Sequence, residues 1–92
     1  MTERYVFRIF VAGDSPNSAQ ALQNLRRICE THLAGVHDID VVDLFLHPER
    51  ALSEGIMVTP TLVKLLPHPT RHIIGNLNQP EQVMQALGLA IS

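Results

Sequence analysis

A long apolar run near the N-terminus is the feature that most constrains the fold. Residues 5–12 read Tyr-Val-Phe-Arg-Ile-Phe-Val-Ala, a nearly continuous series of aromatic and β-branched side chains. Such a run predicts a strand that is covered on both faces, with Arg8 as its one interruption. Gly13 and Asp14 break the strand, and Ser15 followed by Pro16 is a favourable N-cap and first-turn pair for a helix. A buried strand that leads directly into a helix favours a layered α/β fold.

The predicted helix carries one apolar stripe, and a second strand follows it. The apolar positions recur at helical spacing and are Ala19, Leu22, Leu25, Ile28, Cys29 and Leu33. Gly35 is expected to end the helix. Residues 39–46 then predict a strand, because they are mostly apolar and include β-branched and aromatic side chains. A strand, a helix and a strand within about 40 residues form a βαβ unit, in which the strands are normally parallel.

Prolines and glycines divide the second half of the sequence into short elements. A helix of about two turns is expected over residues 48–53, with Gly55 closing it. Residues 58–67 predict a third strand framed by prolines, a turn follows at 68–70, and residues 71–75 predict a short fourth strand that pairs with the third. A final helix gives the order β-α-β-α-β-β-α. This is the order of the thioredoxin fold, here in a single domain over residues 1–92.

The last segment gives conflicting signals. Asn78 is expected to cap the final helix, with Pro80 in its first turn. Helical spacing relates Val83, Leu87 and Ile91, whereas Leu87, Leu89 and Ile91 alternate as in a strand. Ala86 favours a helix, and Gly88 disfavours a helix interior by about 1 kcal/mol relative to alanine. The sequence pattern therefore leaves open whether the segment around position 88 adopts one structure or two.

Charge and cysteine content exclude several classes of protein. The net charge is −2, so no overall positive field attracts nucleic acid. No apolar stretch approaches the roughly 20 residues of a membrane span. Acidic side chains gather at Asp38, Asp40, Asp43, Glu49 and Glu54, whereas Lys64, Arg71 and only one acid, Glu81, lie beyond Gly55. Because Cys29 is the only cysteine, a reducing compartment, the cytoplasm, is expected.

The residues needed for redox or hydrolytic catalysis are missing. Thioredoxins carry two cysteines at the start of the first helix, where this chain has Ser15 and Ser18, and a hydroxyl cannot exchange disulfides. Cys29 lies on the apolar stripe, so burial should raise the pKa of its thiol. His68 and His72 are four residues apart, but Pro69 opposes the helix that would align them on a metal. We therefore predict no enzyme activity, no metal and no cofactor.

Three stretches of the sequence resemble the KaiB family of circadian-clock proteins. They are residues 10–18, Phe-Val-Ala-Gly-Asp-Ser-Pro-Asn-Ser; residues 58–64, Val-Thr-Pro-Thr-Leu-Val-Lys; and residues 66–77, Leu-Pro-His-Pro-Thr-Arg-His-Ile-Ile-Gly-Asn-Leu. The resemblance implies a non-catalytic regulator that binds a hexameric ATPase of the KaiC type and modulates its phosphorylation. It also implies a metamorphic chain that exchanges the thioredoxin-like order for a self-associating β-α-β-β-α-α-β ground state, a dimer or tetramer.

The resemblance further implies the residues of a partner-binding site. Lys64, Arg71 and His72 occupy positions where KaiB-like proteins carry basic residues that help to dock KaiC, and the alternative is that the first two are solvated strand ends. Five residues are expected to shape the fold: Pro60, Pro67, Pro69, Ala86 and Gly88. A histidine kinase or a KaiA-like protein are further expected partners, and the system would serve either a daily rhythm or a stress response.

Two other functions remain open on the sequence. One is the thioredoxin-like sensor domain of a clock-output histidine kinase. The other is a divergent redox enzyme of the thioredoxin family, which would have to depend on Cys29 alone.

Overall fold

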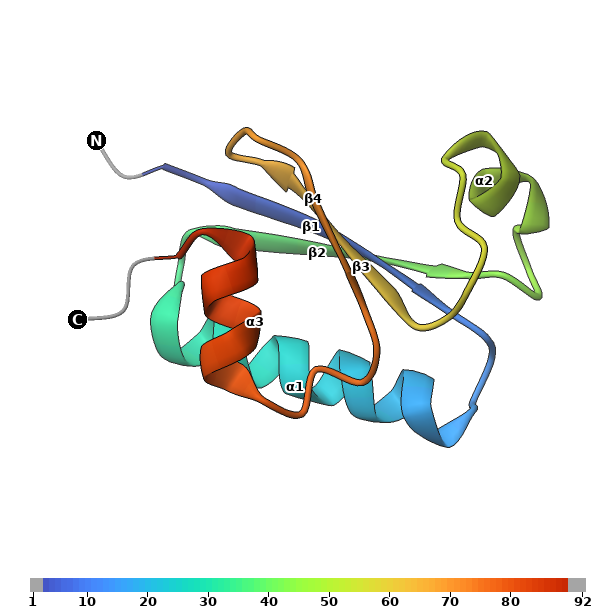
Figure 1. The fold of residues 1–92 in the computed structure, drawn as a ribbon, viewed down its shortest axis with the longest axis horizontal. Coiled ribbons are helices and arrows are strands. Elements are labelled where there is room, and N and C mark those ends of the chain that lie inside the picture. The colour runs from blue at the N-terminus through green and yellow to red at the C-terminus, as the bar shows by residue number, and fades with distance from the viewer. Residues whose placement is uncertain (1–2, 90–92) are drawn as a thin grey trace.

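The computed structural model describes residues 3–89 as a four-stranded sheet with three helices (Figure 1). The strands are β1 (Tyr5–Val11), β2 (His37–Asp43), β3 (Thr61–Leu66) and β4 (Arg71–Ile74). The helices are α1 (Pro16–His32), α2 (Pro48–Ser53) and α3 (Pro80–Leu87). The order along the chain is the predicted thioredoxin-like β-α-β-α-β-β-α, so the alternative order β-α-β-β-α-α-β is not the one adopted in this structure.

The strands lie side by side in the order β2-β1-β3-β4. β1 and β2 are parallel, as the βαβ pattern predicted, and β3 runs antiparallel to both β1 and β4. β1 is therefore central, which explains its apolar run: Phe7 and Ile9 are fully buried on one face, and Phe10 is fully buried on the other. β2 and β4 form the two edges of the sheet.

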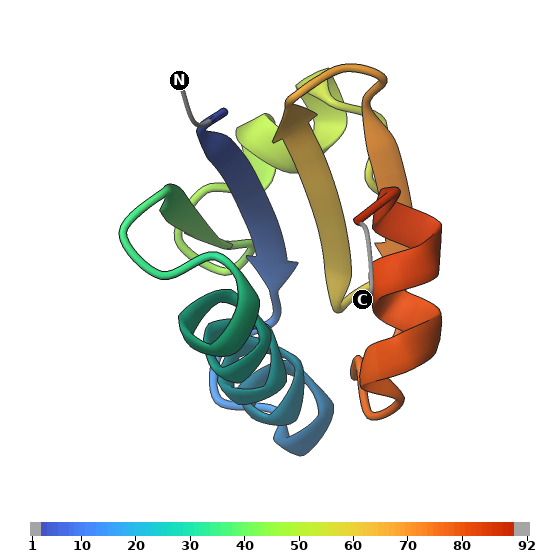
Figure 2. The same ribbon diagram turned by 90° about the vertical axis from the view of Figure 1, so that its left-hand side faces the viewer.

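The helices cover the two faces of the sheet unequally. Figures 1 and 2 show α1 and α3 together on one face and the short α2 on the other. The larger core lies under α1 and α3 and includes Phe7, Leu25 and Leu87. The smaller core lies under α2 and consists of Phe10, Val42, Ala51 and Val63, with partly buried neighbours. α2 is held by few apolar contacts, so polar contacts matter more for its position.

The start of α1 differs in phase from the predicted stripe. The predicted position Ala19 is exposed, whereas Ser18 and Ala21 are buried. Ser15 is the N-cap, as predicted, and its hydroxyl accepts a hydrogen bond of 3.4 Å from the Ser18 amide. The Ser18 hydroxyl accepts a further bond from the Ala12 amide at 3.1 Å, so a buried polar side chain is satisfied at a position that hydrophobicity alone does not identify.

The ends of α3 also differ from prediction. Asn78 is not the cap: α3 begins at Pro80 after Gln79, and the Asn78 amide donates instead to the Asn76 side chain at 3.2 Å. Ala86 lies within α3. Gly88 stands at the C-cap with φ +75°, a left-handed conformation that glycine adopts without a steric penalty. Gly88 thus ends α3 rather than weakening its interior, and Ile91 lies outside the described residues.

Candidate protein-binding site

The three basic residues predicted to bind a partner lie on the neighbouring strands β3 and β4. Lys64 pairs with Arg71 and Val63 pairs with His72 in the antiparallel register. Since successive side chains of a strand point to opposite faces, Lys64 and Arg71 face the side of α3 and His72 faces the side of α2. Arg71 and His72 are exposed, whereas Lys64 is only 4% exposed. Only two of the three residues therefore reach solvent in this fold.

Lys64 joins β3 to the end of α3. Its Nζ donates a buried hydrogen bond of 2.9 Å to the carbonyl oxygen of Leu87, the last residue of that helix. Unpaired carbonyls at a helix C-terminus carry partial negative charge, which favours a cation there. Burial lowers the pKa of Lys64, and the nearby Arg71 guanidinium adds to the effect. Lys64 is thus not a solvated strand end; it fixes α3 against the sheet.

The prolines expected to shape the fold border β3. Pro60 is buried, and its carbonyl oxygen accepts a 3.1 Å hydrogen bond from the Gly75 amide at the end of β4. Pro67 and Pro69 lie in the turn between β3 and β4. The peptide bonds that precede all three prolines are cis. Pro60 thus lies directly before β3, and Pro67 directly after it.

A cleft lies between the end of β4 and α3. Its volume is about 340 Å³, and its lining includes Ile73 and Ala86 together with several side-chain amides. The loop at its base is fixed from α1, because Asn24 Nδ2 donates a 2.8 Å bond to the Asn76 carbonyl oxygen. Leu77 follows with φ +60° and is buried, so packing holds a conformation that costs an ordinary residue about 1 kcal/mol or more.

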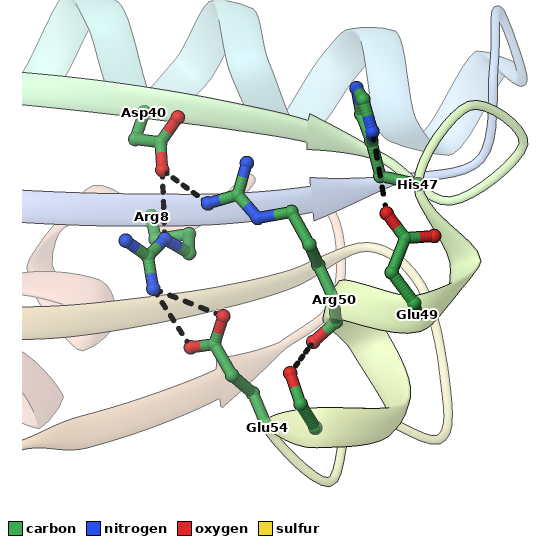
Figure 3. Close-up of polar contacts among 7 residues, drawn as sticks. Arg8, Asp40, His47, Glu49, Arg50 and Glu54 are labelled. Carbon is green, nitrogen blue, oxygen red and sulfur yellow. Dashed lines mark hydrogen bonds and ion pairs between the residues drawn. The ribbon is translucent and has the colours of Figure 1, made fainter.

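A charged network that the sequence analysis missed holds α2 to the opposite face (Figure 3). Arg8 donates from Nε to Asp40 at 2.8 Å and from Nη1 to both carboxylate oxygens of Glu54 at 3.0 Å. Arg50 donates to the same Asp40 oxygen at 3.0 Å. The hydrogen bond from Arg8 is the main cause that lowers the pKa of Asp40. Arg8 and Asp40 are paired positions of the parallel strands β1 and β2. The register of these two predicted strands was therefore the signal that could have identified the ion pair.

Cys29 lies on the buried face of α1, as the apolar stripe predicted. It is fully buried on α1, and burial raises the pKa of its thiol to about 12. At pH 8 its thiolate population should be roughly a thousandfold below that of a thiol with the ordinary value of 9.0. We expect the native protein not to react with an aromatic disulfide reagent over hours, and to react fully in urea. Rapid reaction of the native protein would show that Cys29 is accessible.

Neither a metal-ligand cluster nor a membrane-spanning helix occurs among the described residues. Within residues 3–89, no three or more histidine, cysteine, aspartate or glutamate side chains lie close enough together to hold a metal ion. None of the helices in that range is both long and apolar enough to cross a membrane.

The KaiB domain family matches residues 8–89 of this chain. The chain belongs to the KaiB family. It is 45% identical to the circadian clock oscillator protein KaiB of Synechococcus sp. (strain RCC307), over 92% of this chain and 77% of that protein. It is 43% identical to the KaiB of Picosynechococcus sp. (strain ATCC 27264 / PCC 7002 / PR-6), over 97% of this chain and 86% of that protein. These relatives are named as clock proteins and not as enzymes.

Solved structures place this KaiB-family chain in the thioredoxin-like fold. The N-terminal domain of Synechococcus elongatus SasA superimposes with a TM-score of 0.74 at 23% identity, covering 96% of this chain and 87% of that one. Mitochondrial thioredoxin 3 of Saccharomyces cerevisiae gives 0.73 at 16% identity, covering 96% and 81%. Such low identity shows the fold alone. The predicted family and fold class are therefore confirmed.

Proposed function

We propose that this KaiB-family protein is a non-catalytic regulator that binds a KaiC-like ATPase and modulates its phosphorylation state. Family membership supports a role in a clock system. The observation that carries the proposal is the exposure of Arg71 and His72 on an edge strand, where neither forms an ion pair with any residue between 3 and 89. Arg71 and His72 would contact the ATPase directly, and Lys64 would act by fixing α3.

The proposal includes the wider setting expected from the family. The protein would act in the cytoplasm, in either a circadian or a stress-response system, and would self-associate when it is not bound to the ATPase. A histidine kinase or a KaiA-like protein would be further partners. A sensor domain of a clock-output histidine kinase is a second candidate, but the SasA domain at 23% identity shares only the fold, whereas 45% identity to KaiB supports the first candidate.

Binding to the KaiC homologue of the same genome tests the proposal. We expect a complex on size-exclusion chromatography after long incubation with ATP, and we expect Arg71→Glu to weaken it by roughly tenfold or more, because charge reversal turns attraction into repulsion. Arg27→Glu is the matched control, since Arg27 is exposed on α1, and no residue of α1 belongs to β4 or lines the cleft beside it. Absence of a complex, or equal loss with both variants, would contradict the proposal.

A further inference from the structure

The outer edge of β4 is open. β4 is the last strand of the sheet, and within residues 3–89 no other strand pairs with its outer side. An open edge presents unpaired amide and carbonyl groups to solvent, and an extended chain can pair with them. Figure 2 shows β4 at the border of the sheet, beside α3.

The register determines which backbone groups are unpaired. The Gly75 amide donates to the Pro60 carbonyl, and Ile73 pairs with Leu62 two positions earlier. In antiparallel strands, positions that bond across the ladder alternate with positions whose amide and carbonyl point away. Ile73 therefore bonds toward β3, whereas His72 and Ile74 direct their amides and carbonyls outward. The edge thus offers two donor and acceptor pairs, spaced as an added strand requires.

The charge on this edge selects an acidic chain. Arg71 and His72 are exposed, and the Lys64 ammonium lies across from Arg71 in the register. Neither β4 nor the lining of the adjoining cleft contains an aspartate or glutamate. Glu3 acts electrostatically on the Lys64 ammonium, but Arg71 forms no ion pair with any residue between 3 and 89, so an acidic residue in an approaching strand would meet positive charge at Arg71.

The cleft beside α3 provides a place for a side chain of such a strand. Its apolar lining includes Ile73, Val83 and Ala86, and its polar lining includes Asn78 and Gln82. Ile73 belongs to β4 itself, so a strand that pairs with β4 would direct every second side chain toward α3, beside this cleft. Main-chain bonds with one apolar pocket are the recurring form of recognition by strand addition.

We propose that the outer edge of β4 binds an acidic, extended segment of a partner protein as a fifth strand, with one apolar side chain of that segment in the cleft between β4 and α3. This proposal rests on the proposed function, because Arg71 and His72 belong to the site proposed there. It adds the backbone groups that form the contact and the chemistry of the segment that is recognised.

Hydrogen exchange of individual amides tests the proposal with two probes. The first is the KaiC-like ATPase of the same genome. The second is the synthetic peptide acetyl-Thr-Glu-Asp-Leu-Thr-Thr-amide, in which glutamate and leucine point to the same face, toward Arg71 and the cleft, and aspartate points to the face of His72. A peptide of the same length carrying lysine at both acidic positions is the control. Strand addition should slow exchange at His72 and Ile74, while Arg71 and Ile73, already paired with β3, should change little. The lysine peptide should leave all four amides unchanged.

Two variants separate backbone pairing from charge. Ile74→Pro removes an outward amide, which an edge strand tolerates, and should weaken binding roughly tenfold, whereas Ile74→Thr keeps the amide and should bind as the parent does. Arg71→Glu should weaken binding of the acidic peptide roughly tenfold, and Arg27→Glu should not. A native-like amide spectrum for each variant shows that the fold persists.

The outcomes distinguish this proposal from the proposed function. If the ATPase binds but slows amides elsewhere, the proposed function stands and strand addition is wrong. If the ATPase does not bind but the acidic peptide slows His72 and Ile74, the edge site stands and its assignment to an ATPase is wrong. If neither probe slows these amides, the edge site is wrong. If exchange at these amides slows as the protein concentration rises, with neither probe present, the edge pairs with a second copy of this chain and the proposal is overturned.

Discussion

Lys64→Glu should lower the free energy of unfolding by about 3 kcal/mol or more, since it buries a carboxylate without a partner. Position 64 is 4% exposed and lies against the carbonyl oxygen of Leu87. A carboxylate there would face the negative end of α3 and would replace a hydrogen bond with repulsion. Urea unfolding followed by circular dichroism measures the loss, and faster hydrogen exchange in α3 should accompany it. Stability within 0.5 kcal/mol of the parent, roughly the range of a surface substitution, would contradict the role of Lys64.

Lys64→Met is the matched control, because it keeps an unbranched side chain of similar shape and removes the ammonium. We expect a loss of about 1–2 kcal/mol, which reflects the unpaired Leu87 carbonyl partly offset by removal of a buried charge. The decisive result is that Lys64→Glu loses more stability than Lys64→Met. If methionine were as harmful as glutamate, packing rather than charge would determine the fit of α3.

The pH dependence of stability, compared between the parent and Lys64→Met, gives an independent check. The pKa of Lys64 in the folded state is lowered from its ordinary value of 10.5, chiefly by burial. The folded protein therefore releases this proton at lower pH than the unfolded chain does, so stability relative to Lys64→Met should rise with pH through the folded-state pKa and level off above about 10.5. A difference between the two proteins that does not change across this range would contradict the lowered pKa.

The contrast between Lys64 and Arg71 shows which parts of the site could be predicted from sequence. Both are basic residues of adjacent predicted strands, and the sequence pattern does not distinguish the buried residue from the exposed one. They differ because Lys64 lies on a longer strand beneath the end of α3, whereas Arg71 begins an edge strand. Burial of Lys64 depends on where Gly88 ends α3, and that end was ambiguous because the apolar residues from Leu87 onward fit the spacing of a helix through Ile91 and the alternation of a strand through Leu89. The strands and helices themselves followed from local periodicity, which needs no tertiary information.

The network around Arg8 shows the same limit for long-range contacts. Arg8 was recognised as the one interruption in an apolar strand, but its partners Asp40 and Glu54 lie 32 and 46 residues away along the chain. Parallel pairing of β1 with β2 brings Asp40 opposite Arg8. The short helix α2 brings Glu54 to the other side. Neither contact follows from composition, because the acidic residues there read equally well as a solvated surface.

Arg8→Glu is the second substitution with a large expected effect. The side chain of Arg8 is 25% exposed and neutralises two carboxylates that otherwise lie close together, Asp40 and Glu54. A third carboxylate in place of the Arg8 guanidinium should lower the free energy of unfolding by about 2–3 kcal/mol. The loss is smaller than in a fully buried site because solvent screens part of the repulsion. Because the apolar core under α2 is small, the loss should appear first as faster hydrogen exchange of the Glu54 and Ile56 amides, which bond within α2 and at its end.

Arg4→Glu is the control for charge alone. It makes the same change in net charge at another arginine that pairs with an aspartate, but Arg4 and Asp38 are both exposed, so its effect should be much smaller. Arg8→Met separates lost attraction from added repulsion. It should also make stability less dependent on acid pH. The Arg8 hydrogen bond that lowers the pKa of Asp40 stabilises the parent above the ordinary value of 3.8, and this contribution is lost as the pH falls through the folded-state pKa, so the difference in stability between the parent and Arg8→Met should shrink in acid.

Salt then tests whether repulsion is the cause. At 1 M ionic strength the screening length falls to about 3 Å, so the difference in stability between Arg8→Glu and Arg8→Met should shrink by roughly half or more. The difference between Arg8→Met and the parent should change less, because it includes hydrogen bonds and packing of the arginine stem as well as charge. If the first difference did not respond to salt, crowding of the new side chain against α2 would explain it, and the network would not be what holds α2 in place.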